Sequence, residues 1–166
     1  MGRTSHGFES PRGAAVFRGV SIVNLDTKGR LAVPSKYRER LQASCHSQLV
    51  VTVDRDRCLL LYPEPEWETI EMKLAALPSF DHTARAIQRL YIGNAQEVEM
   101  DAQGRILIPQ YLRDFAVLDK RVAFVGQGSK FELWDEMAWN ARNAAALDDK
   151  GIGELAVAAG LGTLTL

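Results

Sequence analysis

An internal repeat constrains the fold of this chain more than any other feature of its sequence. Residues 23–34 read VNLDTKGRLAVP, and residues 98–109 repeat the pattern as VEMDAQGRILIP at an offset of 75. A second block, residues 58–67, recurs as residues 130–139 at an offset of 72. Two matching blocks in the same order indicate a duplicated module. The second copy is three residues shorter, and we expect a loop to absorb that loss.

The repeat divides the chain into a leader, two modules and a tail. We place the modules at residues 17–92 and 93–147. Residues 1–16 contain Gly, Ser and Pro without a continuous apolar segment, so we expect a disordered leader and no secretory signal. Residues 148–166 are rich in small and apolar residues and glycine, and we expect a disordered tail, with a weak interaction segment as the alternative. Each module has about 45 residues of strand-rich core, so we expect the two to fold together and the chain to form homo-oligomers.

Each module is expected to consist mainly of strands. An apolar stretch precedes Asp26, and the D-x-x-G turn there leads to a short strand ending at Pro34. Pro34 and Pro109 suit the first turn of a short helix that carries Arg38 or Arg113. We expect two hairpins, 49–62 with its turn at 54–57 and 122–134 with its turn at 126–129, and three helices, 65–77, 83–92 with Asp81 as N-cap, and 135–147. The sequence thus predicts an α+β fold of two ββαββ modules joined by helices.

The charges of the chain are segregated along the sequence. The net charge of −1 argues against a nucleic-acid-binding protein, because such domains are usually basic. However, residues 1–62 hold ten Lys and Arg against five Asp and Glu, whereas residues 63–100 hold three against seven. The near-neutral total is therefore a cancellation between regions, and it is compatible with one basic face.

The D-x-x-G-R pattern, present at residues 26–30 (the first turn) and 101–105 (the second turn), allows three interpretations. In a purely structural one, Asp accepts backbone N–H bonds, Gly supplies a positive φ and Arg pairs with Asp. In a catalytic one, the duplicated aspartates form the dyad of a hydrolase, which needs two carboxylates about 3 Å apart that share a proton. The Arg four residues after each Asp would keep both carboxylates ionised, so we do not favour a hydrolase.

The third interpretation is contact with nucleic acid. A basic β-turn can enter the major groove, where Arg binds guanine through two hydrogen bonds and Lys reaches guanine edges or phosphates. The side chains of these types in the two turns are Lys28, Arg30, Gln103 and Arg105. The residues that would orient the turns are Asp26, Gly29, Asp101 and Gly104.

Five segments of the chain closely resemble the MraZ family of transcriptional regulators. They are VFRGVSIVNLDTKGRLAVPSKYRERL, LVVTVDRDRCLLLYPEPEWE, LPSF, QRLYIGNAQEVEMDAQGRILIPQYLR and VGQGSKFELWDEMAWNAR, and together they span Phe17 to about Arg142. The resemblance implies two pseudo-symmetric SpoVT-AbrB modules with swapped hairpins. It also implies that the protomers form a ring, which we expect to be an octamer. It also implies binding to short G-rich DNA repeats upstream of the bacterial division and cell-wall gene cluster, usually with repression.

The resemblance also implies roles for individual residues. The DNA-contacting residues of the family fall on Lys28, Arg30 and Arg105, whereas Gln103 stands where the family is often basic. We therefore expect the second turn to bind DNA more weakly than the first. The family normally begins at a methionine where this chain has Val16, so residues 1–15 look like an upstream extension.

Beyond these residues, the sequence offers no sign of other chemistry. Cys45 and Cys58 lack the C-x-x-C spacing of a zinc site, and no apolar run approaches the roughly 18 residues needed to cross a membrane. We expect no metal, no cofactor, no membrane association and no enzymatic activity. The sequence favours a cytoplasmic, nucleoid-associated, homo-oligomeric repressor that reads double-stranded DNA; the alternative is a structural oligomer that binds DNA nonspecifically.

Overall fold

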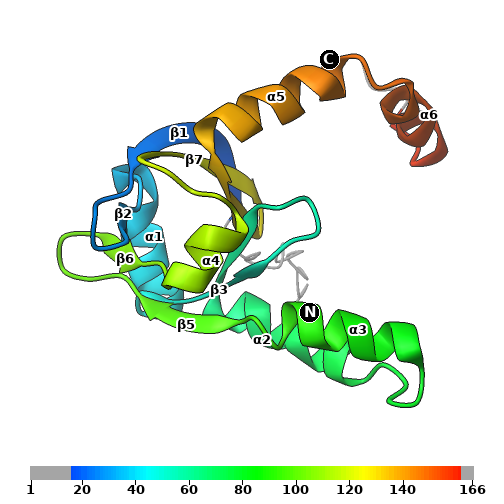
Figure 1. The fold of residues 1–166 in the computed structure, drawn as a ribbon, viewed down its shortest axis with the longest axis horizontal. Coiled ribbons are helices and arrows are strands. Elements are labelled where there is room, and N and C mark those ends of the chain that lie inside the picture. Colours follow the sequence, from blue (N-terminus) through cyan, green and yellow to red (C-terminus); the bar gives the residue numbers. More distant parts are fainter. Residues whose placement is uncertain (1–15, 162–166) are drawn as a thin grey trace, which may run out of the picture.

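The computed structural model describes residues 16–161, and the predicted α+β class is confirmed. Leader residues 1–15 and tail residues 162–166 lie outside the described part. The strands are β1 (Phe17–Asn24), β2 (Arg30–Ala32), β3 (Gln48–Val53), β4 (Leu59–Pro63), β5 (Gln96–Glu99), β6 (Arg105–Leu107), β7 (Arg121–Gly128) and β8 (Lys130–Asp135). The helices are α1 (Ser35–Cys45), α2 (Glu64–Ala75), α3 (His82–Tyr91), α4 (Gln110–Phe115), α5 (Glu136–Leu147) and α6 (Lys150–Ala158). Figure 1 shows their arrangement.

Strands from the two halves of the chain pair with one another. One sheet has the order β1-β7-β8-β4-β3-β5, and a second sheet consists of β2 and β6. The hairpins β3–β4 and β7–β8 form within one half, whereas β1–β7, β4–β8, β3–β5 and β2–β6 all join the first half to the second, and every pairing is antiparallel. The two modules are therefore interlocked.

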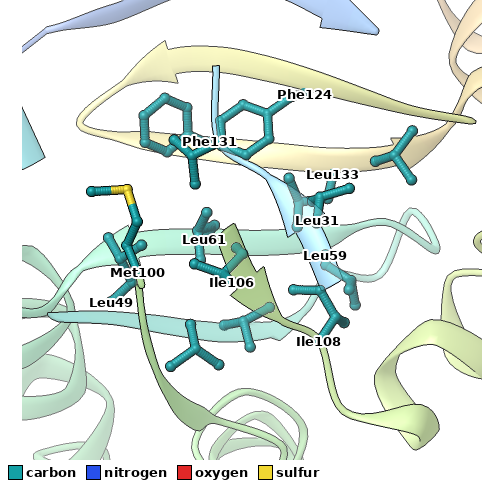
Figure 2. Packing of buried hydrophobic residues seen from close by; sticks show 14 of the residues in the cluster. Leu31, Leu49, Leu59, Leu61, Met100, Ile106, Ile108, Phe124, Phe131 and Leu133 are labelled. Atoms are coloured by element: carbon teal, nitrogen blue, oxygen red, sulfur yellow. The ribbon is translucent and has the colours of Figure 1, made fainter. Parts of the chain in front are cut away.

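The main core is built around the short β2–β6 pair. Leu31 and Ile106 stand opposite each other in its register and are both fully buried. Figure 2 shows their side chains between the leucines of β3 and β4 and the aromatic rings of β7 and β8. Phe124 and Phe131 pack there with ring centroids 4.8 Å apart. Because both halves supply this core, the apolar burial that stabilises each half depends on residues of the other.

Several predicted elements are confirmed with small shifts at their ends. Both hairpins and the three predicted helices are present. The carboxylate of Asp81 accepts hydrogen bonds from the backbone N–H groups of Thr83 and Ala84, so its predicted role as N-cap is confirmed. Pro34 and Pro109 precede their helices as N-caps, with ψ of 134° and 146°, and do not lie inside the first turn as predicted. Proline fixes φ but leaves ψ free, which permits either position.

Three further expectations are wrong. Residues 126–127 were expected in a turn, yet they continue β7 and pair with Phe131 and Lys130 of β8. The shortening of the second copy falls in a helix and not in a loop, because α4 has 6 residues where α1 has 11. Within the tail, residues 150–158 form α6, although disorder was expected. The carboxylate of Asp149 caps this helix by accepting from the N–H of Gly151, which favours helix over coil.

Candidate nucleic-acid interface

Asp26 organises the first turn through both of its carboxylate oxygens. Oδ1 accepts the backbone N–H groups of Lys28 at 2.9 Å and Arg30 at 2.8 Å. Oδ2 accepts the Nε–H of Arg30 at 2.7 Å. These bonds to Arg30 favour the charged carboxylate and lower the pKa of Asp26 below its ordinary value. One ionised side chain therefore closes the turn and fixes the direction of the arginine.

The second turn repeats this arrangement with one weaker contact. Oδ1 of Asp101 accepts the backbone N–H groups of Gln103 and Arg105, both at 2.9 Å. Oδ2 accepts the Nε–H of Arg105 at 3.2 Å. The pKa of Asp101 is also lowered, chiefly by the backbone N–H of Arg105. In both turns, one aspartate therefore bonds two backbone N–H groups and the arginine side chain.

The two turns lead into opposite ends of the β2–β6 pair. Its antiparallel register sets Arg30 opposite Leu107 and Arg105 opposite Ala32. The carbonyl oxygen of each turn glycine accepts a hydrogen bond from the other half: Gly104 from the N–H of Val33 at 2.8 Å, and Gly29 from the N–H of Ile108 at 2.9 Å. Figure 1 shows both loops projecting on the side of the molecule away from α5 and α6. The structure therefore places the predicted residues in two turns on one side of the molecule, with Arg30 and Arg105 at opposite ends of the β2–β6 pair.

The side chains of both turns are accessible to a ligand. Lys28 and Gln103 are exposed, and the side chains of Arg30 and Arg105 retain 35% and 34% of their accessible surface. In both arginines the bond to aspartate uses Nε. Because a guanidinium has five donors, this bond leaves the Nη groups to reach a planar acceptor such as a guanine edge.

Two arginines that sequence reasoning left without a role hold the turns in place. Arg38 of α1 donates from Nε to the carbonyl of Val33 at 2.8 Å, and Arg113 of α4 donates to the carbonyl of Ile108 at 3.0 Å. Each of the two guanidiniums lies over the turn glycine of the opposite half. Their recurrence at the repeat offset of 75 was the signal that could have identified them.

Glycine is required beneath each of these guanidiniums. Gly29 and Gly104 have φ of 88° and 74°, in the left-handed region that disfavours other residues. A Cβ at Gly104 would lie 2.2 Å from Nε of Arg38, and one at Gly29 would lie 2.7 Å from Cζ of Arg113. We call these two contacts the crossed arginine–glycine pairs. Through them, the helix of one half holds the turn of the other.

The geometry does not support a pair of catalytic aspartates. Such a pair shares a proton, which requires one carboxyl with a raised pKa. Here both pKa values are lowered, because each aspartate is bonded within its own turn. Among residues 16–161 the structure has no group of three or more His, Cys, Asp or Glu side chains placed to hold a metal ion.

The remaining reactive groups lie away from the turns. Cys45 and Cys58 are free and buried, and burial raises the pKa of both thiols, so the reactive thiolate form is disfavoured. The helices of the described region are too short or too polar for any of them to cross a bilayer.

Comparison with known proteins gives a consistent family. A family model described as "MraZ protein, putative antitoxin-like" matches the chain twice, at residues 16–90 and 91–150. Among similar proteins named "Transcriptional regulator MraZ", that of Thioalkalivibrio sulfidiphilus is 61% identical over 124 residues, which cover 75% of this chain and 83% of the relative. That of Halorhodospira halophila is 53% identical over 147 residues, covering 84% of this chain and 97% of the relative. These matches, together with the interlocked double module, show that the chain belongs to the MraZ family.

Proposed function

We propose that this protein is a sequence-specific DNA-binding transcriptional repressor. It represses the division and cell-wall gene cluster by binding short G-rich repeats upstream of that cluster. The protein would be cytoplasmic and associated with the nucleoid. The names of the relatives support the regulatory role. The observation that carries the DNA-binding role is the pair of exposed turns in which an ionised aspartate orients an arginine.

The proposed reading mechanism follows from the geometry of the turns. Each turn enters the major groove, and the Nη groups of Arg30 or Arg105 donate to O6 and N7 of a guanine. Asp26 and Asp101 hold each guanidinium in one orientation, which reduces the conformational entropy lost on binding. Lys28 adds a contact to phosphate or to a guanine edge. Gln103 is neutral at the corresponding position, so the second turn contributes less electrostatic attraction.

Assembly supplies the affinity that one subunit lacks. The turns of one subunit offer three cationic side chains, Lys28, Arg30 and Arg105, which are few for tight binding. In a homo-oligomeric ring, with an octamer as the proposed size, several subunits would meet successive DNA repeats. Each binding event after the first is then intramolecular and can raise the avidity by about 10²–10⁴.

The test is a titration of the protein against the DNA upstream of its own gene. Fluorescence anisotropy at two salt concentrations would compare this DNA with a scrambled duplex of equal length and with a duplex carrying one repeat. We expect a strong preference over scrambled DNA, and a loss of affinity on shortening that exceeds the change in repeat number. Each engaged subunit should also steepen the salt slope by about two units.

Two results would contradict the proposal. Equal binding to native and scrambled DNA would favour the nonspecific structural oligomer, since nonspecific binding is nearly all counterion release. Equal affinity and salt slope for one repeat and for the full array would rule out the multivalent mechanism.

A further inference from the structure

The two halves of the molecule cover their outer sheet faces unequally. In the first half, Val50, Leu60, Tyr62 and Trp67 form a buried cluster on this face. The helix pair α2–α3 covers it, and Tyr91, Ile92 and Ala95, at and after the end of α3, pack against the cluster. The hydroxyl of Thr52 on β3 also donates to the carbonyl of Tyr91 at 2.7 Å, which ties the end of α3 to the sheet.

The second half has the corresponding cluster with only one of its two helices in place. Ala123, Val125 and Trp134 are buried there together with Cys58 from the first half, and Trp139 of α5 packs against them. In the order of the repeat, α5–α6 corresponds to α2–α3. The described residues that pack on this cluster include none from α6.

An apolar surface remains open beside this cluster. Val20 and Ile22 point outward from β1 and are 47% and 41% exposed. They stand opposite Val125 and Ala123 of β7, so they extend the second cluster across the sheet. We call Val20 and Ile22 the β1 face. Its counterpart β5 carries Glu97, which pairs with Val50 as Ile22 pairs with Ala123. The apolar character is therefore specific to β1, the edge strand that pairs with the β7–β8 hairpin of the second half.

Helix α6 has apolar side chains and nothing to bury them against. Ile152, Leu155 and Val157 are 52%, 69% and 70% exposed, and none of the residues of this helix is buried. It has 9 residues and includes Gly151 and Gly153. An isolated helix shorter than about 12–15 residues is marginal in water, and each glycine costs up to about 1 kcal/mol relative to alanine. Helix α6 therefore needs a docking surface to be stable.

The connection between α5 and α6 keeps α6 away from its own sheet. Only Asp148 and Asp149 join the two helices, whereas residues 76–81 join α2 to α3. Asp148 is right-handed helical, and Asp149 is held as the N-cap by its bond to the N–H of Gly151. Figure 1 shows α5 leaving the sheet and α6 at its far end, separated from the body of the molecule.

We propose that α6 of one copy of this chain packs on the β1 face of a second copy. Ile152 and Leu155 would lie on Val20 and Ile22, in the place that α3 takes in the first half. Arg18, exposed beside Val20, and Glu154 of α6 carry opposite charges. The donor and acceptor surfaces differ, so the contact is head-to-tail and each copy can both give and receive a helix. This contact would assemble the multivalent form in the proposed function, and its test does not use DNA.

The experiment measures the mass of the full-length chain by sedimentation equilibrium and native mass spectrometry. Ile22→Lys places a charge in the β1 face, and Leu155→Lys places one in α6. We expect the wild type to be an oligomer and each variant to weaken self-association at least ten-fold. The matched control is Val117→Lys, since Val117 is 74% exposed and belongs to neither surface. Its mass should equal that of the wild type.

Mixing the two variants gives the sharpest result. In a 1:1 mixture, Leu155→Lys retains an intact β1 face and Ile22→Lys retains an intact α6, so one contact can form. We therefore expect a heterodimer that does not grow further. Val20→Lys, with folding checked by circular dichroism, replaces Ile22→Lys if that variant does not fold.

Several outcomes would overturn the inference. The first is a monomeric wild type. The second is an unchanged mass in both variants, which is expected if α6 docks within its own chain. The third is a mixture in which both variants stay monomeric. The result is independent of the proposed DNA reading, because the affinity of both variants for a single repeat should equal that of the wild type. A loss of affinity for the single repeat would instead mean that the substitution disturbs the turns.

Discussion

The first and second turns have the same hydrogen-bonded backbone but differ in exposed side chains. In both, an aspartate accepts hydrogen bonds from two backbone N–H groups and from the side-chain Nε–H of the arginine four residues later. The bond from Arg30 to Asp26 is 2.7 Å long, whereas that from Arg105 to Asp101 is 3.2 Å. Lys28 of the first turn is replaced by Gln103 in the second. The two copies thus share the hydrogen bonds that shape the turn, but they differ in the side chain exposed at its third position.

The largest expected effect comes from separating the halves. A chain of residues 93–166 loses the β1–β7, β2–β6, β3–β5 and β4–β8 pairings and keeps only β7–β8. We expect it to be unfolded or aggregated, and to show no cooperative transition by circular dichroism or calorimetry. A monomeric fragment that unfolds cooperatively would mean that the two turns sit on independent domains.

The next effect separates the two arginines. Arg30→Ala should weaken binding to a multi-repeat duplex by ten-fold or more, since one bidentate contact to guanine is worth about 1–3 kcal/mol and is repeated in each engaged subunit. Arg105→Ala should cost less, because its turn lacks the lysine. Anisotropy titrations with an unchanged oligomer mass would measure both. Equal losses would refute the predicted ranking of the turns, and unchanged affinity of Arg30→Ala would refute direct reading.

A smaller effect should follow from exchanging the residues that differ. Gln103→Lys adds one cation per subunit, so it should raise affinity and steepen the salt slope by about one unit per engaged subunit. Lys28→Gln is the matched opposite and should flatten the slope by the same amount. The slope of log affinity against log salt concentration measures both. A slope that does not move in Gln103→Lys would place the second turn away from the phosphates.

The smallest effect is on the pH dependence of the turns. The pKa values of Asp26 and Asp101 are lowered in the folded chain, so each carboxylate stabilises the fold above its unfolded pKa. This contribution is lost as the pH falls through the folded pKa, below the ordinary value of 3.8. Carboxyl carbon chemical shifts in an NMR titration should give midpoints below 3.8 for both. A midpoint above it would mean that the bonds to arginine and backbone do not persist in solution.

Local patterns in the sequence predicted the local parts of this structure. The hairpins, the cap at Asp81 and the organisation of the two turns depend on residues close together in the chain. The continuation of β7 through Gly126 and Gln127 was missed, since these residues pair not only with the adjacent β8 but also with β1, which lies far earlier in the chain. The crossed arginine–glycine pairs were missed for the same reason, because they form only once the halves interlock.

Helix α6 shows a different limit. Its small, apolar and glycine residues favoured disorder over a weak interaction segment, yet residues 150–158 form a helix with no buried residue. Sequence composition reports whether a segment can bury apolar area within its own domain. It does not report a surface on another copy.

The crossed arginine–glycine pairs also limit how the gene can change. A side chain larger than glycine at position 104 meets Arg38, which is encoded in the other half of the gene, and the same holds for position 29 and Arg113. A mutation at either glycine would thus strain the positive φ and also clash with the arginine, and a mutation in the opposite repeat can relieve only the clash. Selection for suppressors of Gly104→Ala should recover changes at Arg38. The exposed side chains of the two turns can therefore change independently, whereas each turn glycine stays tied to an arginine encoded in the opposite repeat.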